Sequence, residues 1–129
     1  MESKTLSSKP DCLAPDSSEI RLLAATSRVS TVHCSLPPGQ VSLAVAHKSV
    51  EEIWYFIEGR GEVWRKQGDD EDVTTVVPGV SLAIPTGAHF QFRNTGAVPL
   101  RFYAPPFLPG PVRTKPTASN TTGRLSCSG

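Results

Sequence analysis

Through the middle of the chain, apolar and polar residues alternate in short runs, which is the pattern of β-strands with one buried face. Val, Ile, Phe, Tyr, Trp and Thr dominate the runs, and turn-forming Gly, Pro, Asn and Asp residues separate them. No segment has the periodicity of an amphipathic helix of useful length. The sequence therefore predicts an all-β sandwich or barrel. The predicted strands are 19–25, 29–36, 41–47, 52–58, 61–67, 72–77, 80–84, 88–94 and 98–104.

The two ends of the chain lack this pattern. Residues 1–17 are rich in Ser, Lys, Asp and Pro, and residues 111–129 contain one leucine and no aromatic residue. Neither segment can bury enough apolar surface to offset the entropy lost when it becomes ordered. A chain of 129 residues is long enough for one domain with one core. We therefore expect one β-domain over 18–110, with a flexible segment at each end.

Charge and hydropathy narrow the range of partners. The formal net charge of +1 gives no electrostatic reason to expect a nucleic acid or an anionic membrane as partner. No apolar run approaches the length needed to span a bilayer. The N-terminus has no apolar core of the kind found in secretory signals, so a cytoplasmic location is expected.

Histidine and glutamate side chains are the candidate functional groups. Because side chains alternate along a strand, His47 shares one face of its strand with Val45, and Glu52 shares a face with Trp54. In the run 88–94, His89 and Gln91 share one face. If His47, Glu52 and His89 point inward, Gln91 does too, in a mostly apolar lumen typical of a small-molecule pocket.

Each of these residues also has a simpler interpretation. His47 can be a strand-end histidine bonded to a loop, and Glu51 competes with Glu52 for the inward position. His89 can sit beside the Pro-Gly turn without a ligand role. His33 is either a surface histidine or a side chain that supports the same site.

Two segments of the sequence show a specific spacing. The first has Gly39, five residues, Val45-Ala46-His47, four residues, Glu52, six residues and Gly59. This resembles the first motif of the cupin superfamily, which is a glycine, five residues, His-x-His, three or four residues, Glu, six residues and a glycine. Val45 stands where that motif has its first histidine, and valine cannot bind a metal ion.

The second segment has Gly79, five residues, Pro85-Thr86-Gly87, one residue, His89, four residues and Asn94. It is similar to the second cupin motif, which is a glycine, five residues, Pro-x-Gly, two residues, His, three residues and Asn. The spacing before and after His89 is shifted by one residue in opposite directions. The resemblance covers about 36–106.

The resemblance implies a double-stranded β-helix, or jelly-roll barrel, that binds one divalent metal ion (Fe, Mn, Ni or Zn) through His47, Glu52 and His89. It implies an enzyme of the dioxygenase or isomerase type that acts on a small oxygen-rich molecule, with Glu52 also able to act as a base. Because Gln91 shares the face of His89, we expect it to donate a hydrogen bond to the ligand or to another residue of the site. It also implies a homodimer, for which the strand 19–25 is the candidate edge. The alternative, which Val45 favours, is a non-catalytic cupin that binds a sugar or another small ligand.

Overall fold

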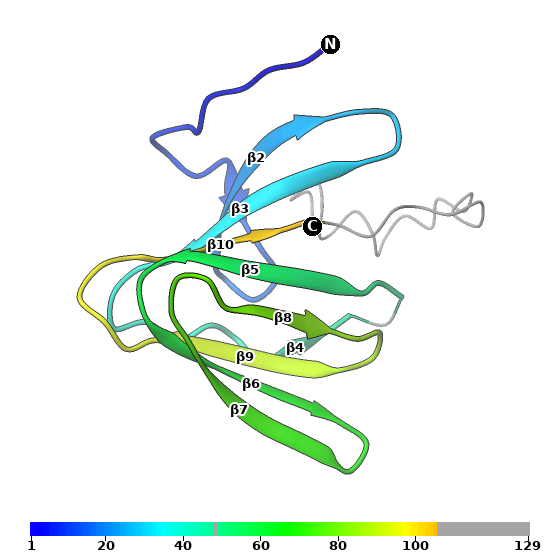
Figure 1. Ribbon diagram of the computed structural model, residues 1–129, viewed down its shortest axis with the longest axis vertical. Coiled ribbons are helices and arrows are strands. Elements are labelled where there is room, and N and C mark those ends of the chain that lie inside the picture. The colour runs from blue at the N-terminus through cyan, green and yellow to red at the C-terminus, as the bar shows by residue number, and fades with distance from the viewer. Residues whose placement is uncertain (48, 106–129) are drawn as a thin grey trace.

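The computed structural model describes residues 1–47 and 49–105 (Figure 1). These residues form strands and no helix, so the predicted all-β jelly-roll barrel is confirmed. None of the described segments is a helix long and apolar enough to cross a membrane. The strands are β1 (Cys12–Leu13), β2 (Glu19–Ala25), β3 (Ser30–Leu36), β4 (Val45–Ala46), β5 (Glu52–Glu58), β6 (Gly61–Gln67), β7 (Asp70–Val76), β8 (Ser81–Ile84), β9 (His89–Asn94) and β10 (Leu100–Ala104).

The strands form two antiparallel sheets that enclose the core (Figure 1). The six-stranded sheet has the order β1-β2-β3-β10-β5-β8, and the four-stranded sheet has the order β4-β9-β6-β7. Between the sheets lies a cluster of fully buried aromatic rings from β5, β9 and β10. The Trp54 ring stacks on Phe102 with centroids 4.4 Å apart and meets Phe90 edge-on at 5.2 Å. These rings fill the middle of the barrel, so a ligand site within the lumen has to lie towards one of its ends.

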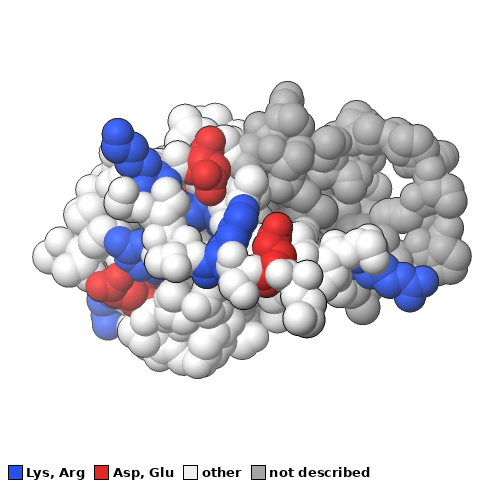
Figure 2. Space-filling view, turned by 90° about the horizontal axis from the view of Figure 1, so that it is seen from above, with Lys and Arg blue, Asp and Glu red and all other residues white. Residues whose placement is uncertain are grey.

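Charged side chains of the two signs are interspersed on the described part of the face shown in Figure 2. This mixed distribution fits the formal net charge of +1. A surface of this kind creates no extended field of one sign that would attract a polyanion.

Asn94 and Gly59 hold together the end of the barrel where β5 and β9 end. The Asn94 amide nitrogen donates to the carbonyl oxygens of Leu36, at 2.9 Å, and Val98, at 2.8 Å. Gly59 has a φ of +90°, and a β-carbon there would lie 2.6 Å from the carbonyl oxygen of Pro99. Only glycine fits this combination of backbone angle and close approach without strain.

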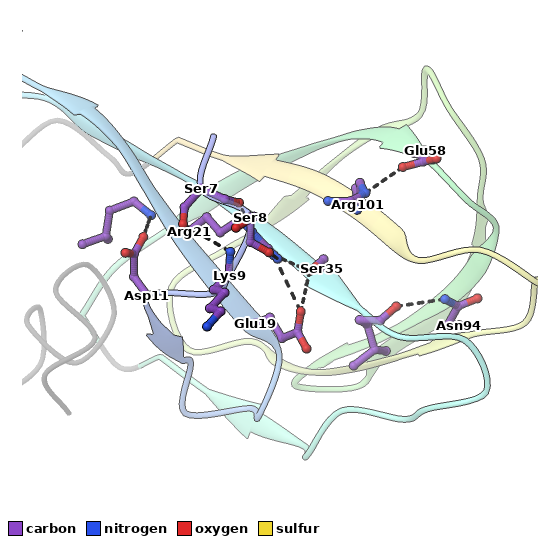
Figure 3. Close-up of polar contacts among 12 residues, drawn as sticks. Ser7, Ser8, Lys9, Asp11, Glu19, Arg21, Ser35, Glu58, Asn94 and Arg101 are labelled. Atoms are coloured by element: carbon purple, nitrogen blue, oxygen red, sulfur yellow. Dashed lines mark hydrogen bonds and ion pairs between the residues drawn. The ribbon is translucent and has the colours of Figure 1, made fainter. Parts of the chain in front are cut away.

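The N-terminal segment 1–17, predicted to be flexible, instead runs beside the six-stranded sheet (Figures 1 and 3). It contributes β1, which pairs with β2. The Arg21 guanidinium donates to the carbonyl oxygens of Ser7, at 2.8 Å, and Ser8, at 3.2 Å. Hydrogen bonds from backbone and charged groups hold this segment, and a sequence pattern of buried apolar residues does not reveal such bonds. Strand pairing thus extends to Cys12, the predicted domain boundaries at 18 and 110 stay predictions, and the predicted tail 111–129 lies outside the described residues.

The same segment also covers part of the strand that was expected to pair with a second copy. The amide nitrogen of Leu22 donates to the Asp11 carboxylate at 2.7 Å, and that of Ala25 donates to Glu2 at 2.8 Å. These β2 groups already have partners within the chain, so they are less able to pair with the edge of another protomer.

Candidate functional site

His47 and Glu52 meet at the end of the barrel where β5 begins. Glu52 opens β5, where its side chain points inward and is only 6% exposed, whereas Glu51 is exposed. His47 Nε2 lies 3.0 Å from Glu52 Oε2, and the indole nitrogen of Trp54 donates to Glu52 Oε1 at 2.8 Å. Each carboxylate oxygen therefore has a partner, as a buried carboxylate requires.

An irregular stretch of chain positions His47. The predicted strand 41–47 is interrupted, because Ser42 points inward while Val41 and Leu43 are exposed. The Ser42 hydroxyl accepts a hydrogen bond from the amide of Phe92 at 3.0 Å, which holds the interruption against β9. The chain then resumes as β4, and Gly87 donates its amide to the carbonyl oxygen of His47 at 2.8 Å. This bond fixes the backbone beside the imidazole.

A small cavity of about 30 Å³ lies against this pair. Its wall is mostly apolar, with Val45, Trp54 and Phe90 among the lining residues. The N-terminal segment lines another side of it with Ala14, Pro15 and Asp16. The space is about what one or two water molecules need.

Asp16 is a third polar group at this cavity, and the sequence analysis missed it. Its carboxyl is 7% exposed and accepts hydrogen bonds from the amide, at 2.9 Å, and the hydroxyl, at 2.6 Å, of Ser18. Burial raises the pKa of Asp16, the Ser18 hydrogen bonds oppose that rise, and the nearby Glu52 adds to it. The one signal in the sequence was an acid two residues before a serine, which is typical of an Asx turn.

His89 and Gln91 do not reach this cavity. In the pairing of β4 with β9, Val45 lies opposite Phe90 and Ala46 lies opposite His89. Phe90 therefore points into the core with Val45, while His89 is exposed on the outer face of the sheet. Gln91, two residues along, shares that outer face. A shift of one residue in a strand exchanges its two faces, which is the consequence of the altered spacing around His89.

The donors present do not match the predicted metal site. Counted by the spacing of the second motif, Phe90 rather than His89 takes the position of the motif's histidine. Val45 and Phe90 thus place apolar side chains where two imidazoles would be needed, and His47 and Glu52 remain. Within residues 1–47 and 49–105, no three His, Cys, Asp or Glu side chains converge closely enough to hold a metal ion. The fit is therefore poor for an ion held by the protein alone.

His33 does not support this site either, and it is not a surface residue. Its side chain is 2% exposed and lies on the face of β3 opposite to Val32, which lines the cavity. It packs edge-on against Tyr103, and within the described residues neither ring nitrogen has a hydrogen-bond partner. Burial, with the positive charges of Arg101 and Arg21, lowers the pKa of His33.

Comparisons with known proteins agree with this architecture. A protein of Bacillus halodurans is 25% identical, with a TM-score of 0.62 over 70% of each chain. A predicted oxalate decarboxylase of Thermotoga maritima is 19% identical, with a TM-score of 0.62 over 81% of this chain and 99% of that one. The CENP-C domain of Drosophila melanogaster is 12% identical, with a TM-score of 0.64 over 71% of this chain and 68% of that one. A search of curated proteins found no match.

The family comparison covers more than half of the chain. The cupin domain family matches residues 32–105, a range that runs from β3 to the end of β10 and contains both His47 and Glu52. The chain belongs to the cupin family.

Proposed function

We propose that this cupin binds a small oxygen-rich molecule at the cavity beside His47 and Glu52, without a tightly held metal ion. The observation that carries the proposal is the 3.0 Å contact of imidazole and carboxylate in a cavity that Val45 and Phe90 otherwise make apolar. A hydroxyl or carbonyl group of a ligand can exchange hydrogen bonds with either member of the pair. The surrounding apolar wall strengthens such bonds because water competes less for them.

The N-terminal segment controls access in this proposal. A cavity of about 30 Å³ is too small for a metabolite, so a ligand has to displace residues 14–16. The segment is joined to the barrel there by the amide of Leu43, which donates to the carbonyl oxygen of Asp16 at 2.7 Å. Displacing residues 14–16 uncovers the Asp16 carboxyl group, which can then accept hydrogen bonds from ligand hydroxyls.

A metal-dependent enzyme is the second candidate, and the adjacency of His47 and Glu52 favours it. Structural neighbours include an oxalate decarboxylase with Mn(II) centres, 17% identical to this chain. An ion of Fe, Mn, Ni or Zn at these two residues would need its other ligands from the bound molecule or from water. A redox-inert ion there would polarise a ligand carbonyl, which is the chemistry that an isomerase needs, whereas iron(II) would supply the oxygen binding that a dioxygenase needs.

Metal analysis and a ligand screen separate the two candidates. The full chain, purified without a histidine tag, is analysed for bound metal and then screened by thermal shift against polyols, hydroxy acids and dicarboxylates. We expect less than stoichiometric metal, and a stabilising ligand whose effect is lost in His47→Ala and Glu52→Gln. His89→Ala is the matched control, because it removes an imidazole from the outer face and should leave the ligand effect unchanged. Stoichiometric metal that disappears in His47→Ala would instead support the enzyme.

The homodimer implied by the family resemblance stays a prediction, with a different surface. Since the N-terminal segment occupies part of the β2 edge, we propose that pairing uses the outer face of β5 and β10. Ile53, Tyr55 and Tyr103 are exposed there, and Tyr55 lies directly opposite Tyr103. Light scattering on the full chain should give the mass of a dimer, and Tyr55→Glu should shift it towards the monomer.

A further inference from the structure

The outer face of the four-stranded sheet carries a second candidate site. Trp64 of β6 lies at its centre, opposite Val73 of β7 on one side and Gln91 of β9 on the other. A shallow groove of about 270 Å³ runs over this face. Val41, Glu62 and Arg93 also line it. It lies on the face of β9 opposite to Phe90 and therefore opposite to the His47 cavity.

The floor of this groove is apolar and already ordered. The indole nitrogen of Trp64 donates to a carboxylate oxygen of Glu71 at 2.6 Å, which fixes the orientation of the ring. Val41 and Val73 beside it are exposed by more than half of their surface. An aromatic ring and two aliphatic side chains gathered on one open face mark a binding surface more often than single exposed residues do.

The rim of the groove offers hydrogen bonds without net charge. Arg93 Nε donates to Glu62 Oε1 at 2.8 Å, so the two charges balance one another. The amide nitrogen of Gln91 donates to the carbonyl oxygen of Ser42 at 2.9 Å, which leaves the Gln91 amide oxygen to accept from a ligand. A groove with paired charges favours neutral ligands over phosphates or carboxylates.

The geometry points to a saccharide as the occupant. The C–H face of a pyranose ring is apolar and flat enough to pack on the Trp64 indole, while its hydroxyls project sideways from the ring edge. Hydroxyls both donate and accept, so Glu62, Gln91 and Arg93 can each bind one. This site is independent of the proposed function, because it shares no residue with the His47 cavity.

The test uses the chain's two tryptophans as separate reporters. The full-length ¹⁵N-labelled protein is titrated with four neutral tetrasaccharides: cellotetraose, xylotetraose, maltotetraose and N-acetylchitotetraose. We expect at least one of them to shift the indole N–H signal of Trp64 and to leave that of the buried Trp54 in place. Trp64→Ala should weaken binding at least about tenfold, and Trp64→Phe, which keeps a flat ring, should lose less.

Two control variants locate the effect on the protein. Leu13→Ala and Val98→Ala each remove an exposed apolar side chain that does not line the groove. Neither should change saccharide affinity. The proposal is overturned if none of the four tetrasaccharides moves the Trp64 signal at about 10 mM, a concentration that detects even millimolar binding. It is equally overturned if Trp64→Ala binds them as tightly as the natural sequence does.

Discussion

Replacing His47 by leucine tests whether the buried pair is energetically coupled. Glu52 is 6% exposed, and its Oε2 would lose a partner 3.0 Å away, while Oε1 would keep the Trp54 indole. Leucine has a similar volume, so the change removes the hydrogen bond without opening a large cavity. Removing the imidazole partner of a buried carboxylate should cost about 3 kcal/mol of unfolding free energy.

A double-mutant cycle with Glu52→Gln isolates that cost. The glutamine amide carries no charge, and its oxygen can still accept from Trp54. We therefore expect His47→Leu to cost about 2 kcal/mol less in the Glu52→Gln background than in the natural sequence. The assay is urea unfolding at pH 7, followed by tryptophan fluorescence. If the two single changes add to within about 0.5 kcal/mol of the double, the contact carries no coupling and the reasoning fails.

Three further predictions concern other parts of the barrel. Gly59→Ala should lower the free energy of unfolding by at least about 3 kcal/mol, because it combines a positive φ with a clash against Pro99. Gly79→Ala has a φ of +99° but open space around the new β-carbon, so it should lower the unfolding free energy by only about 1 kcal/mol in the same urea assay. Burial lowers the pKa of His33 below its ordinary value of 6.5, so on acidification the unfolded chain binds a proton at His33 before the folded chain does. The free energy of unfolding should therefore fall as the pH drops below 6.5. His33→Phe should reduce this dependence of the unfolding free energy on pH, measured by urea titrations from about pH 7 to 5. Val45→His combined with Phe90→His should supply the two missing imidazoles and create Co²⁺ binding visible in the absorption spectrum, at a packing cost of about 3 kcal/mol. No Co²⁺ signal in a folded double variant would refute the assignment of Phe90 to the ligand position.

The strands whose alternation is regular were predictable from the sequence. The runs 52–58 and 61–67 coincide with β5 and β6, because β5 buries Glu52, Trp54 and Phe56 on one face and β6 buries Gly61 and Val63 on one face. The run 41–47 was predicted as one strand and is not, because Ser42 turns inward to bond with β9 and shifts the residues after it. That shift depends on the hydrogen bond between Ser42 and Phe92, which are 50 positions apart, so it cannot be predicted from the alternation of residues within 41–47.

The candidate site was predictable to the same limited extent. The motif around His47 and Glu52 has the usual spacing and predicted their inward placement. The motif around His89 is shifted by one residue, and the predicted inward placement of His89 was therefore wrong. Asp16 was missed for another reason: a segment poor in apolar residues can still be ordered when its backbone and carboxyl groups find partners, as Asp16 does with Ser18 and Leu43.

The register of β9 links the two sites. With Phe90 and Phe92 directed inward, the lumen gains aromatic packing around Trp54 and loses an imidazole that a metal ion would need. The same register sends His89 and Gln91 to the outer face, where Gln91 lies opposite Trp64. One displaced residue therefore makes the interior more apolar and the outer face more polar. If β9 had the usual motif spacing, a histidine would face the lumen for a metal ion, and Gln91 would no longer lie beside Trp64 in the groove. Tests of metal binding and of saccharide binding therefore examine opposite consequences of the register of β9.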